Sequence, residues 1–146
     1  MSEELKANVL VVDDEEQFLD ALSQRLKGRG MKIDAVTSGE EALRHAKDRD
    51  FDAIVLDLVL PGMSGMEILK RMKGENPDLQ IIILTGHATV EKGVEAIKEG
   101  AIEFMEKPID INKLVEKIGE AQRKKILVVE KKAEERVKDL LQSKGW

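Results

Sequence analysis

The stretch that decides the fold is VLVVDDEE, residues 9–16, in which four apolar residues are followed directly by four acids. The apolar part is typical of a strand that is covered on both faces. Carboxylates this close together repel one another, and they lose hydration if the strand end lies in a crevice. The stretch therefore predicts that a positive charge lies at the end of this strand.

Outward from this stretch, short apolar runs alternate with segments of helical period. Strands are expected at 8–13 and in four further runs, KIDAVT (32–37), FDAIVLD (51–57), LQIIILT (79–85) and IEFMEKP (102–108). Helices are expected at 18–28, 38–48, 64–74 and 88–100, and from about Asp110. Ser38, with Glu41 three residues later, has the capping-box pattern of a helix start, and Gly100 is a typical helix end.

This order predicts an α/β fold, in which a single doubly wound sheet of five parallel strands has helices on both faces. Such sheets place their sites just outside the carboxyl ends of the strands. The polar residues at those ends are Asp13, Asp14, Asp57, Thr85 and Lys107. We expect them to meet at one edge, where the carboxylates would hold Mg²⁺ and the site would attract a phosphoryl group.

Composition limits the alternatives. The 146 residues suffice for one domain, and 42% are hydrophobic without any run long enough to span a membrane. There is no cysteine and no secretion signal, so we expect a cytoplasmic protein without disulfides or a thiolate zinc site. Residues 1–118 carry 24 acids against 16 basic residues, which argues against a nucleic-acid surface.

Four motifs together resemble the receiver domain of two-component response regulators, which has a flavodoxin-like (βα)5 fold. They are VDD after the first strand, VLDLVLPGMSG around Asp57, ILTGHA with Thr85, and FMEKP with Lys107. The resemblance covers about residues 6–120. Within the family, the sequence looks most like receivers of enhancer-type transcription regulators.

The resemblance implies a role for each site residue. Asp57 would accept a phosphoryl group from a sensor histidine kinase, a phosphotransfer protein or a small phosphodonor. Asp13, Asp14, Asp57 and the backbone carbonyl of Val59 would bind Mg²⁺, and Lys107 would stabilise the phosphoryl oxygens. Thr85 would bind the phosphoryl group, and the Lys107–Pro108 bond would be cis. As an acceptor domain, the chain would not turn over an independent substrate.

Signal output follows from the same resemblance. Phe104 would rotate inward when Thr85 moves toward the phosphoryl group, and this would reshape a protein-interaction face. Phe104 also fits an ordinary core position. Apolar Val59 offers no group to orient a hydrolytic water, which favours a long-lived phosphoryl state.

Residues 121–146 exceed what a receiver domain needs. Apolar residues recur every three or four positions at Ile126, Val129, Ala133, Val137 and Leu140, which predicts an amphipathic helix that extends the last one. We expect this extension to dimerise as a short coiled coil or to serve as a linker. Intramolecular docking, fraying, or a strand at KILVVE (125–130) are the alternatives.

Three function classes are compatible with an aspartate at a strand end. A signalling receiver fits best, either standing alone and acting on a downstream protein, or as a fragment of a transcriptional regulator whose output domain is missing. A haloacid-dehalogenase-type phosphatase would need a second Asp two residues after Asp57, where this chain has Val59. A flavodoxin-type cofactor domain would need a phosphate loop after the first strand, where DDEEQ would repel phosphate.

Overall fold

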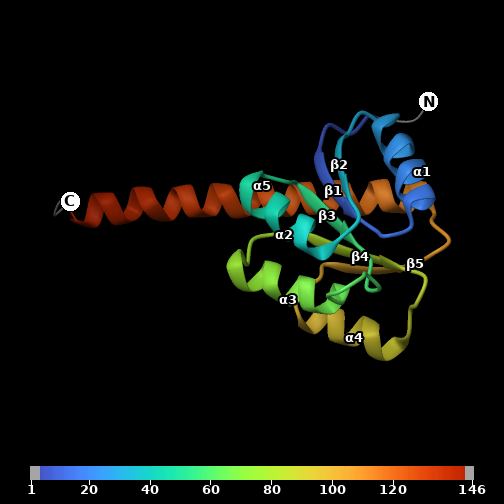
Figure 1. Cartoon of the computed structure of the whole chain (residues 1–146). Coiled ribbons are helices and arrows are strands. Elements are labelled where there is room, and N and C mark those ends of the chain that lie inside the picture. The colour runs from blue at the N-terminus through green and yellow to red at the C-terminus, as the bar shows by residue number, and fades with distance from the viewer. Residues whose placement is uncertain (1–3, 144–146) are drawn as a thin grey trace.

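The computed structural model describes residues 4–143, which form five strands and five helices in strict alternation. The strands are β1 (Asn8–Val12), β2 (Lys32–Val36), β3 (Ala53–Leu56), β4 (Ile81–Thr85) and β5 (Glu103–Glu106). The helices are α1 (Glu16–Lys27), α2 (Gly39–Asp48), α3 (Gly65–Glu75), α4 (Val90–Lys98) and α5 (Ile111–Ser143). All strand pairs are parallel, in the order β2-β1-β3-β4-β5 (Figure 1). The predicted doubly wound sheet is therefore confirmed.

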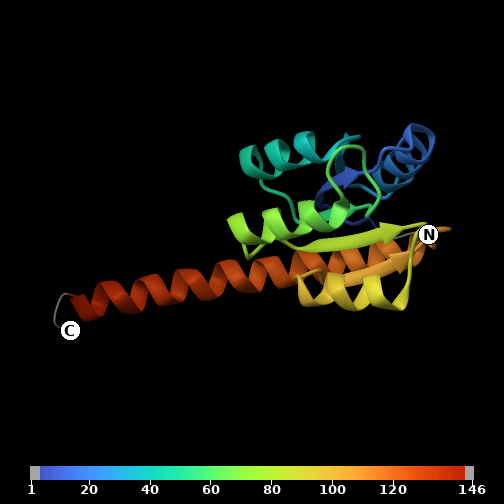
Figure 2. The same ribbon diagram turned by 60° about the horizontal axis from the view of Figure 1, so that its bottom comes forward.

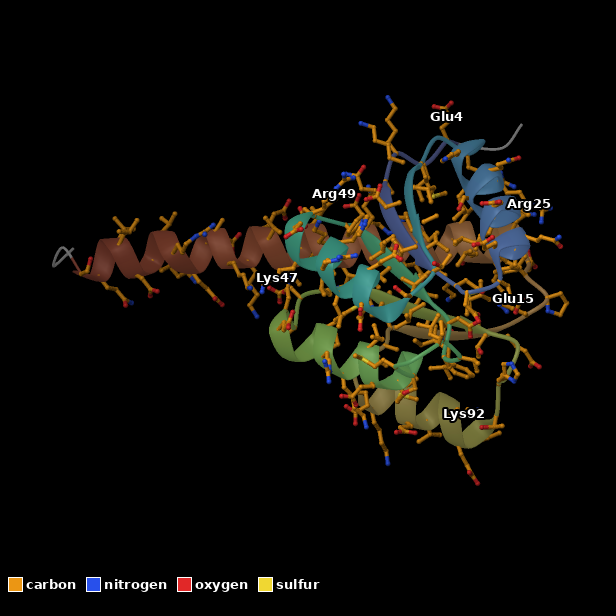
Figure 3. All side chains as sticks on the ribbon, viewed as in Figure 1. Glu4, Glu15, Arg25, Lys47, Arg49 and Lys92 are labelled. Atoms are coloured by element: carbon orange, nitrogen blue, oxygen red, sulfur yellow. The ribbon has the colours of Figure 1, made fainter. Side chains whose placement is uncertain are left out.

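Two apolar clusters lie on opposite faces of the sheet. Along β1, Leu10 and Val12 belong to the cluster that α2, α3 and α4 cover, whereas Val9 and Val11 belong to the cluster under α1 and α5. This alternation follows the two-residue period of a strand. Both faces of the strand are buried, which is why its apolar run is continuous rather than alternating with polar residues. Figure 3 shows the charged helix residues Arg25, Lys47 and Lys92 at the periphery, where they are exposed.

Helix boundaries agree with the capping signals. The Ser38 hydroxyl accepts the backbone N–H of Glu41, as the capping box predicts, and the Ser64 hydroxyl likewise accepts the N–H of Glu67. Gly100 follows α4 with φ +106°, a conformation that favours glycine. Strand β4 begins two residues later than predicted: Leu79 still belongs to the preceding turn, where its N–H donates to the Asn76 carbonyl and its carbonyl accepts a hydrogen bond from the Lys73 ammonium.

Helix α5 is the longest element, and it runs unbroken from 111 to 143 (Figure 2). Its first turns bury Leu114, Ile118 and Ala121 against the sheet, and its C-terminal part projects beyond the domain. Near the point of exit, the Lys125 ammonium lies 2.6 Å from Oδ1 of Asp50. The predicted helical extension is confirmed as far as residue 143, residues 144–146 lie outside the described part of the chain, and the strand alternative for residues 125–130 is wrong.

None of the helices within residues 4–143 is both long enough and apolar enough to cross a membrane.

Candidate functional site

The site lies where the carboxyl ends of four strands meet. Asp13 directly follows β1, Asp57 follows β3, Thr85 is the last residue of β4, and Lys107 follows β5. Because all strands are parallel, these ends lie at the same edge of the sheet. The sequence prediction that these residues gather at one edge is confirmed by the topology.

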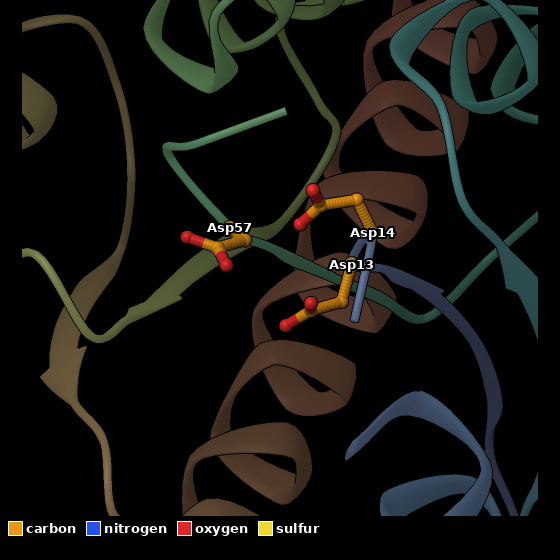
Figure 4. Close-up of side chains that lie close together, drawn as sticks. All are labelled: Asp13, Asp14 and Asp57. Carbon is orange, nitrogen blue, oxygen red and sulfur yellow. The ribbon is translucent and has the colours of Figure 1, made fainter. Parts of the chain in front are cut away.

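Three carboxylates converge at this edge (Figure 4). One carboxylate oxygen from each of Asp13, Asp14 and Asp57 lies within 4.8 Å of the others. Asp13 and Asp57 are 2% and 3% exposed, whereas Asp14 is exposed to solvent. Buried carboxylates this close together need a compensating positive charge.

Lys107 supplies a positive charge within the chain. Its Nζ atom lies 2.7 Å from Oδ2 of Asp13, 3.1 Å from Oδ2 of Asp57 and 3.5 Å from Oε1 of Glu15. The lysine side chain is only 12% exposed. The positive partner that the opening stretch predicts is therefore present, and it comes from the end of β5.

The site also shifts the protonation equilibria of Asp13 and Lys107. Burial raises the pKa of Asp13 above its usual value, although the hydrogen bond from Lys107 works in the opposite direction. Burial disfavours the charged form of Lys107, but hydrogen bonds and attraction from Asp13 and Asp57 outweigh burial and raise the pKa of its ammonium. Lys107 is therefore a firmly charged cation at neutral pH.

Backbone groups hold two of the carboxylates in place. Oδ1 of Asp13 accepts the backbone N–H of Glu15 at 2.9 Å, and Oδ1 of Asp57 accepts the N–H of Val59 at 3.2 Å. Gly65, the first residue of α3, packs so closely under Asp57 that a Cβ atom there would lie 2.0 Å from the Asp57 carbonyl oxygen. Only glycine allows α3 to start at this distance.

The remaining predicted site residues lie around this cluster. Thr85 is fully buried, and its hydroxyl accepts the backbone N–H of His87 at 3.2 Å. Phe104 is half-buried on β5, and its ring lies close to Gly93 of α4, where a Cβ atom would be a tight 3.2 Å from the ring. The Lys107–Pro108 peptide bond is cis, as predicted.

Sequence reasoning missed two neighbours of Lys107. The carboxylate of Glu15 is one, and the ring of Phe18, whose centroid lies 4.1 Å from the Lys107 Nζ atom, is the other. Phe18 was recognised only as an apolar position of a helix. The sequence does place Phe18 in the first turn of the helix that follows the first strand. Because that helix begins at the edge of the sheet where the site lies, this position could have indicated a contact with the site.

The donor set fits a hard divalent cation. Carboxylate oxygens are the ligands that Mg²⁺ prefers, and an exposed member such as Asp14 leaves part of the coordination shell to water. A lysine ammonium beside the same carboxylates adds a second positive charge for an anionic ligand. Together these groups are suited to bind a phosphoryl group next to a nucleophilic carboxylate.

Comparison with known proteins agrees with this chemistry. A family model described as response regulator receiver domain matches residues 9–119. The transcriptional regulatory protein ZraR of Klebsiella oxytoca is 34% identical over 116 residues, which are 80% of this chain and 26% of that relative. FixJ of Bradyrhizobium diazoefficiens is 35% identical over 118 residues, 81% of this chain and 58% of FixJ.

Solved structures give the same result. A response regulator receiver domain from Clostridium thermocellum superposes with a TM-score of 0.79 at 34% identity, covering 84% of this chain and 98% of that one. NtrX from Brucella abortus gives a TM-score of 0.79 at 30% identity, over 86% of this chain and 29% of NtrX. The chain thus spans about a quarter of the ZraR relative, and the predicted likeness to receivers of transcription regulators is confirmed.

Proposed function

The chain belongs to the response regulator receiver family of two-component signalling, and from that premise we propose that Asp57 is its phosphoacceptor. The observation that carries this proposal is the buried Asp57 carboxylate, which contacts the Lys107 ammonium at 3.1 Å and has two further carboxylates beside it. This arrangement combines a nucleophile with the cationic groups that a phosphoryl group needs.

The proposed reaction transfers a phosphoryl group from a carrier to the carboxylate of Asp57. A carboxylate oxygen of Asp57 forms a bond to phosphorus while the bond from phosphorus to its previous carrier breaks. The carrier is a histidine nitrogen of a sensor kinase or phosphotransfer protein, or the acetate oxygen of acetyl phosphate. The leaving imidazole or acetate keeps the bonding electron pair, and Lys107 offers N–H donors to the phosphoryl oxygens as charge redistributes.

The same acids are proposed to hold Mg²⁺. Asp13, Asp14 and Asp57 would supply carboxylate ligands, and the carbonyl of Val59 would supply a fourth oxygen. When bound, the ion would offset negative charge on the carboxylates and on the phosphoryl oxygens. Burial raises the pKa of Asp13 even with Lys107 beside it, so a bound cation would further stabilise its ionised form.

Thr85 and Phe104 are proposed as the switch. The Thr85 hydroxyl would leave its hydrogen bond with His87 and donate to a phosphoryl oxygen on Asp57. Phe104, which is only half-buried, would rotate inward toward the space beside Thr85. The surface between α4 and β5 would change shape as a result, which is a population shift toward a state that phosphorylation favours.

The partners follow from this chemistry. A histidine kinase or phosphotransfer protein would supply the phosphoryl group in the cytoplasm, and a downstream protein or an effector domain would read the switched surface. The matched regions cover only about a quarter of the relatives named transcriptional regulatory proteins ZraR and DctD. The proposal therefore holds equally for a receiver that acts alone and for a receiver that is a fragment of such a regulator. We do not assign this chain a nucleic-acid surface or turnover of an independent substrate.

Residues 6–120 are proposed as the receiver unit and 121–146 as its extension. Within the described part of the extension, Ile126, Val129, Val137 and Leu140 are about half exposed and lie along one side of α5. A second copy of the helix would cover this stripe in a homodimer. Where the helix leaves the receiver, Lys125 contacts Asp50 and Lys132 contacts Asp78.

Intact mass spectrometry tests the proposal. Incubation with acetyl phosphate and Mg²⁺ should add one phosphoryl group to the chain, and the Asp57→Asn variant should add none. The matched control is Asp20→Asn on the exposed surface of α1, which should behave as the original chain does. Uptake by the Asp57→Asn variant would contradict the proposal, and continuous hydrolysis of unrelated phosphate esters would favour the phosphatase reading.

A further inference from the structure

The ammonium of Lys107 rests on an aromatic ring. Its Nζ atom lies 4.1 Å from the centroid of the Phe18 ring, in addition to its contacts with Asp13 and Asp57. Phe18 stands in the first turn of α1, and its half-buried ring packs against the apolar cluster under α1 and α5. The ring is therefore anchored to the core while it contacts the site.

We propose that Phe18 is a positioning residue for phosphoryl transfer, because its ring holds the Lys107 ammonium within reach of Asp57. This inference rests on the proposed function of Asp57. The negative face of an aromatic ring attracts a cation, and the attraction grows when water is partly excluded. With only 12% of the lysine side chain exposed, the site meets that condition.

Several acids compete for the Lys107 ammonium, and the Phe18 ring limits where the ammonium can lie. Lysine has a long, flexible stem, and three carboxylates lie within 3.5 Å of its Nζ atom, from Asp13, Asp57 and Glu15. The Glu15 side chain is 67% exposed and attracts the ammonium toward solvent. Asp13 makes the shortest contact of the three. A fixed ring face restricts the ammonium to positions from which it also contacts Asp57.

A simple packing role for Phe18 leads to different expectations. Phe18→Leu keeps an apolar side chain but removes the ring face, whereas Phe18→Tyr keeps the ring. Replacing Phe18 by 3,4,5-trifluorophenylalanine weakens the negative face while the shape stays nearly the same. A packing residue would tolerate the fluorinated ring without loss, but a positioning residue would not.

Two readouts on the full chain test the inference. The first is the ring-current displacement of the Lys107 ε-methylene proton signals in metal-free protein, measured by NMR, which does not depend on phosphorylation. The second is the rate of phosphoryl uptake from acetyl phosphate with Mg²⁺. We expect Phe18→Leu to abolish the displacement and slow uptake about three- to tenfold, and Phe18→Tyr to preserve both. The fluorinated variant should slow uptake without a change in melting temperature.

The matched controls are Phe51→Leu and the fluorinated replacement of Phe51, a residue that is 4% exposed in the cluster on the opposite face of the sheet. These should leave the Lys107 signals and the uptake rate unchanged even where they reduce stability. Unchanged uptake in the fluorinated variant of Phe18 would overturn the inference, whatever the leucine variant does, as would the absence of a displacement in the original chain. A chain that shows the displacement but takes up no phosphoryl group would instead overturn the proposed function of Asp57. The contact between Phe18 and Lys107 would then stand, but its role in phosphoryl transfer would not.

Discussion

The Nζ atom of Lys107 lies 2.7 Å from Oδ2 of Asp13, although the two residues are 94 positions apart in the chain. Asp13 follows β1 and Lys107 follows β5, and two strands, β3 and β4, separate β1 from β5 in the sheet. The lysine therefore reaches across the carboxyl edge to the acids. Asp57, which follows β3, lies on the way and contacts the same ammonium.

Loss of this cation should destabilise the metal-free protein. We expect Lys107→Ala to lower the free energy of unfolding by about 2 kcal/mol in EDTA, because mostly buried carboxylates lose their positive partner. Saturating Mg²⁺ should recover most of the loss, since the variant keeps all three acids. Urea unfolding with and without Mg²⁺ measures both values.

The control for this variant is Lys117→Ala, which removes ion pairs with Glu103 and Glu120 away from the carboxyl edge. Little change is expected there, because ion pairs at the partly exposed surface contribute little. Equal losses in the two variants, or a Lys107→Ala chain that no longer binds Mg²⁺, would rule out the assigned role of Lys107.

The pKa of Asp13 predicts a pH dependence of stability in the absence of metal. The pKa of Asp13 is higher in the folded chain than in the unfolded chain. At a pH between these two pKa values, the folded chain therefore binds more protons than the unfolded chain does, and stability falls as pH rises. The contribution of Asp13 to stability is therefore present below its unfolded pKa and is lost as pH rises through the folded pKa. Asp13→Asn should remove this loss, so the variant gains stability relative to the original chain as pH rises.

Urea unfolding in EDTA between about pH 4 and about pH 7 measures this difference, since the interval begins near the ordinary pKa of aspartate. The asparagine can still accept the backbone N–H of Glu15, so the turn after β1 is retained. If the difference in unfolding free energy between Asp13→Asn and the original chain does not change with pH, the predicted upward shift in the pKa of Asp13 is wrong.

Metal binding should depend on Asp14 more than the fold does. Asp14 is exposed, and its replacement by alanine should leave the metal-free melting temperature nearly unchanged. In the original chain, Mg²⁺ at ten times its dissociation constant should stabilise the fold by about 1.4 kcal/mol, and this gain should largely vanish in Asp14→Ala. Thermal melting with and without chelator measures it.

Glu16→Ala is the matched control, because Glu16 is also exposed and lies two residues away. Its Mg²⁺ response should equal that of the original chain. An undiminished response in Asp14→Ala would exclude Asp14 from the metal site.

Self-association should depend on one side of α5. We expect the double variant Val137→Glu and Leu140→Glu to shift the chain toward monomer without changing phosphoryl uptake, because both side chains lie on the exposed stripe. Sedimentation velocity measures the change. Substitutions are preferable to deletion, since deletion from residue 123 would also remove the contact between Lys125 and Asp50.

Leu127→Glu is the control for the stripe. Leu127 is 63% exposed, but it lies about 100° around the helix from Ile126 and so faces away from the stripe. It should not change the sedimentation coefficient. A chain that is monomeric before any substitution would exclude dimerisation through α5.

Much of this architecture could be predicted from the sequence. Continuous apolar runs that end in Asp13, Asp57 and Thr85 specify buried parallel strands, and parallel strands bring their carboxyl ends to one edge. Capping residues such as Ser38 and Ser64 fixed the helix starts within one residue. These signals are local in the sequence, and the elements that they predict are the elements found in the folded chain.

The contacts of Lys107 were harder to predict, because they depend on how elements distant in sequence approach each other. The place of Phe18 under the ammonium depends on the angle at which α1 leaves β1. Likewise, the Lys73 ammonium reaches the carbonyl of Leu79 in the turn before β4. Periodicity carries no information about either contact.

The most direct test of the central claim is the position of the phosphoryl group in the chain. Borohydride reduces an acyl phosphate and converts that aspartate to homoserine, which tandem mass spectrometry locates in the digested protein. After treatment with acetyl phosphate and Mg²⁺, we predict homoserine at position 57 and unmodified aspartate at positions 13 and 14. Homoserine at position 13 or 14, with residue 57 unmodified, would contradict the account.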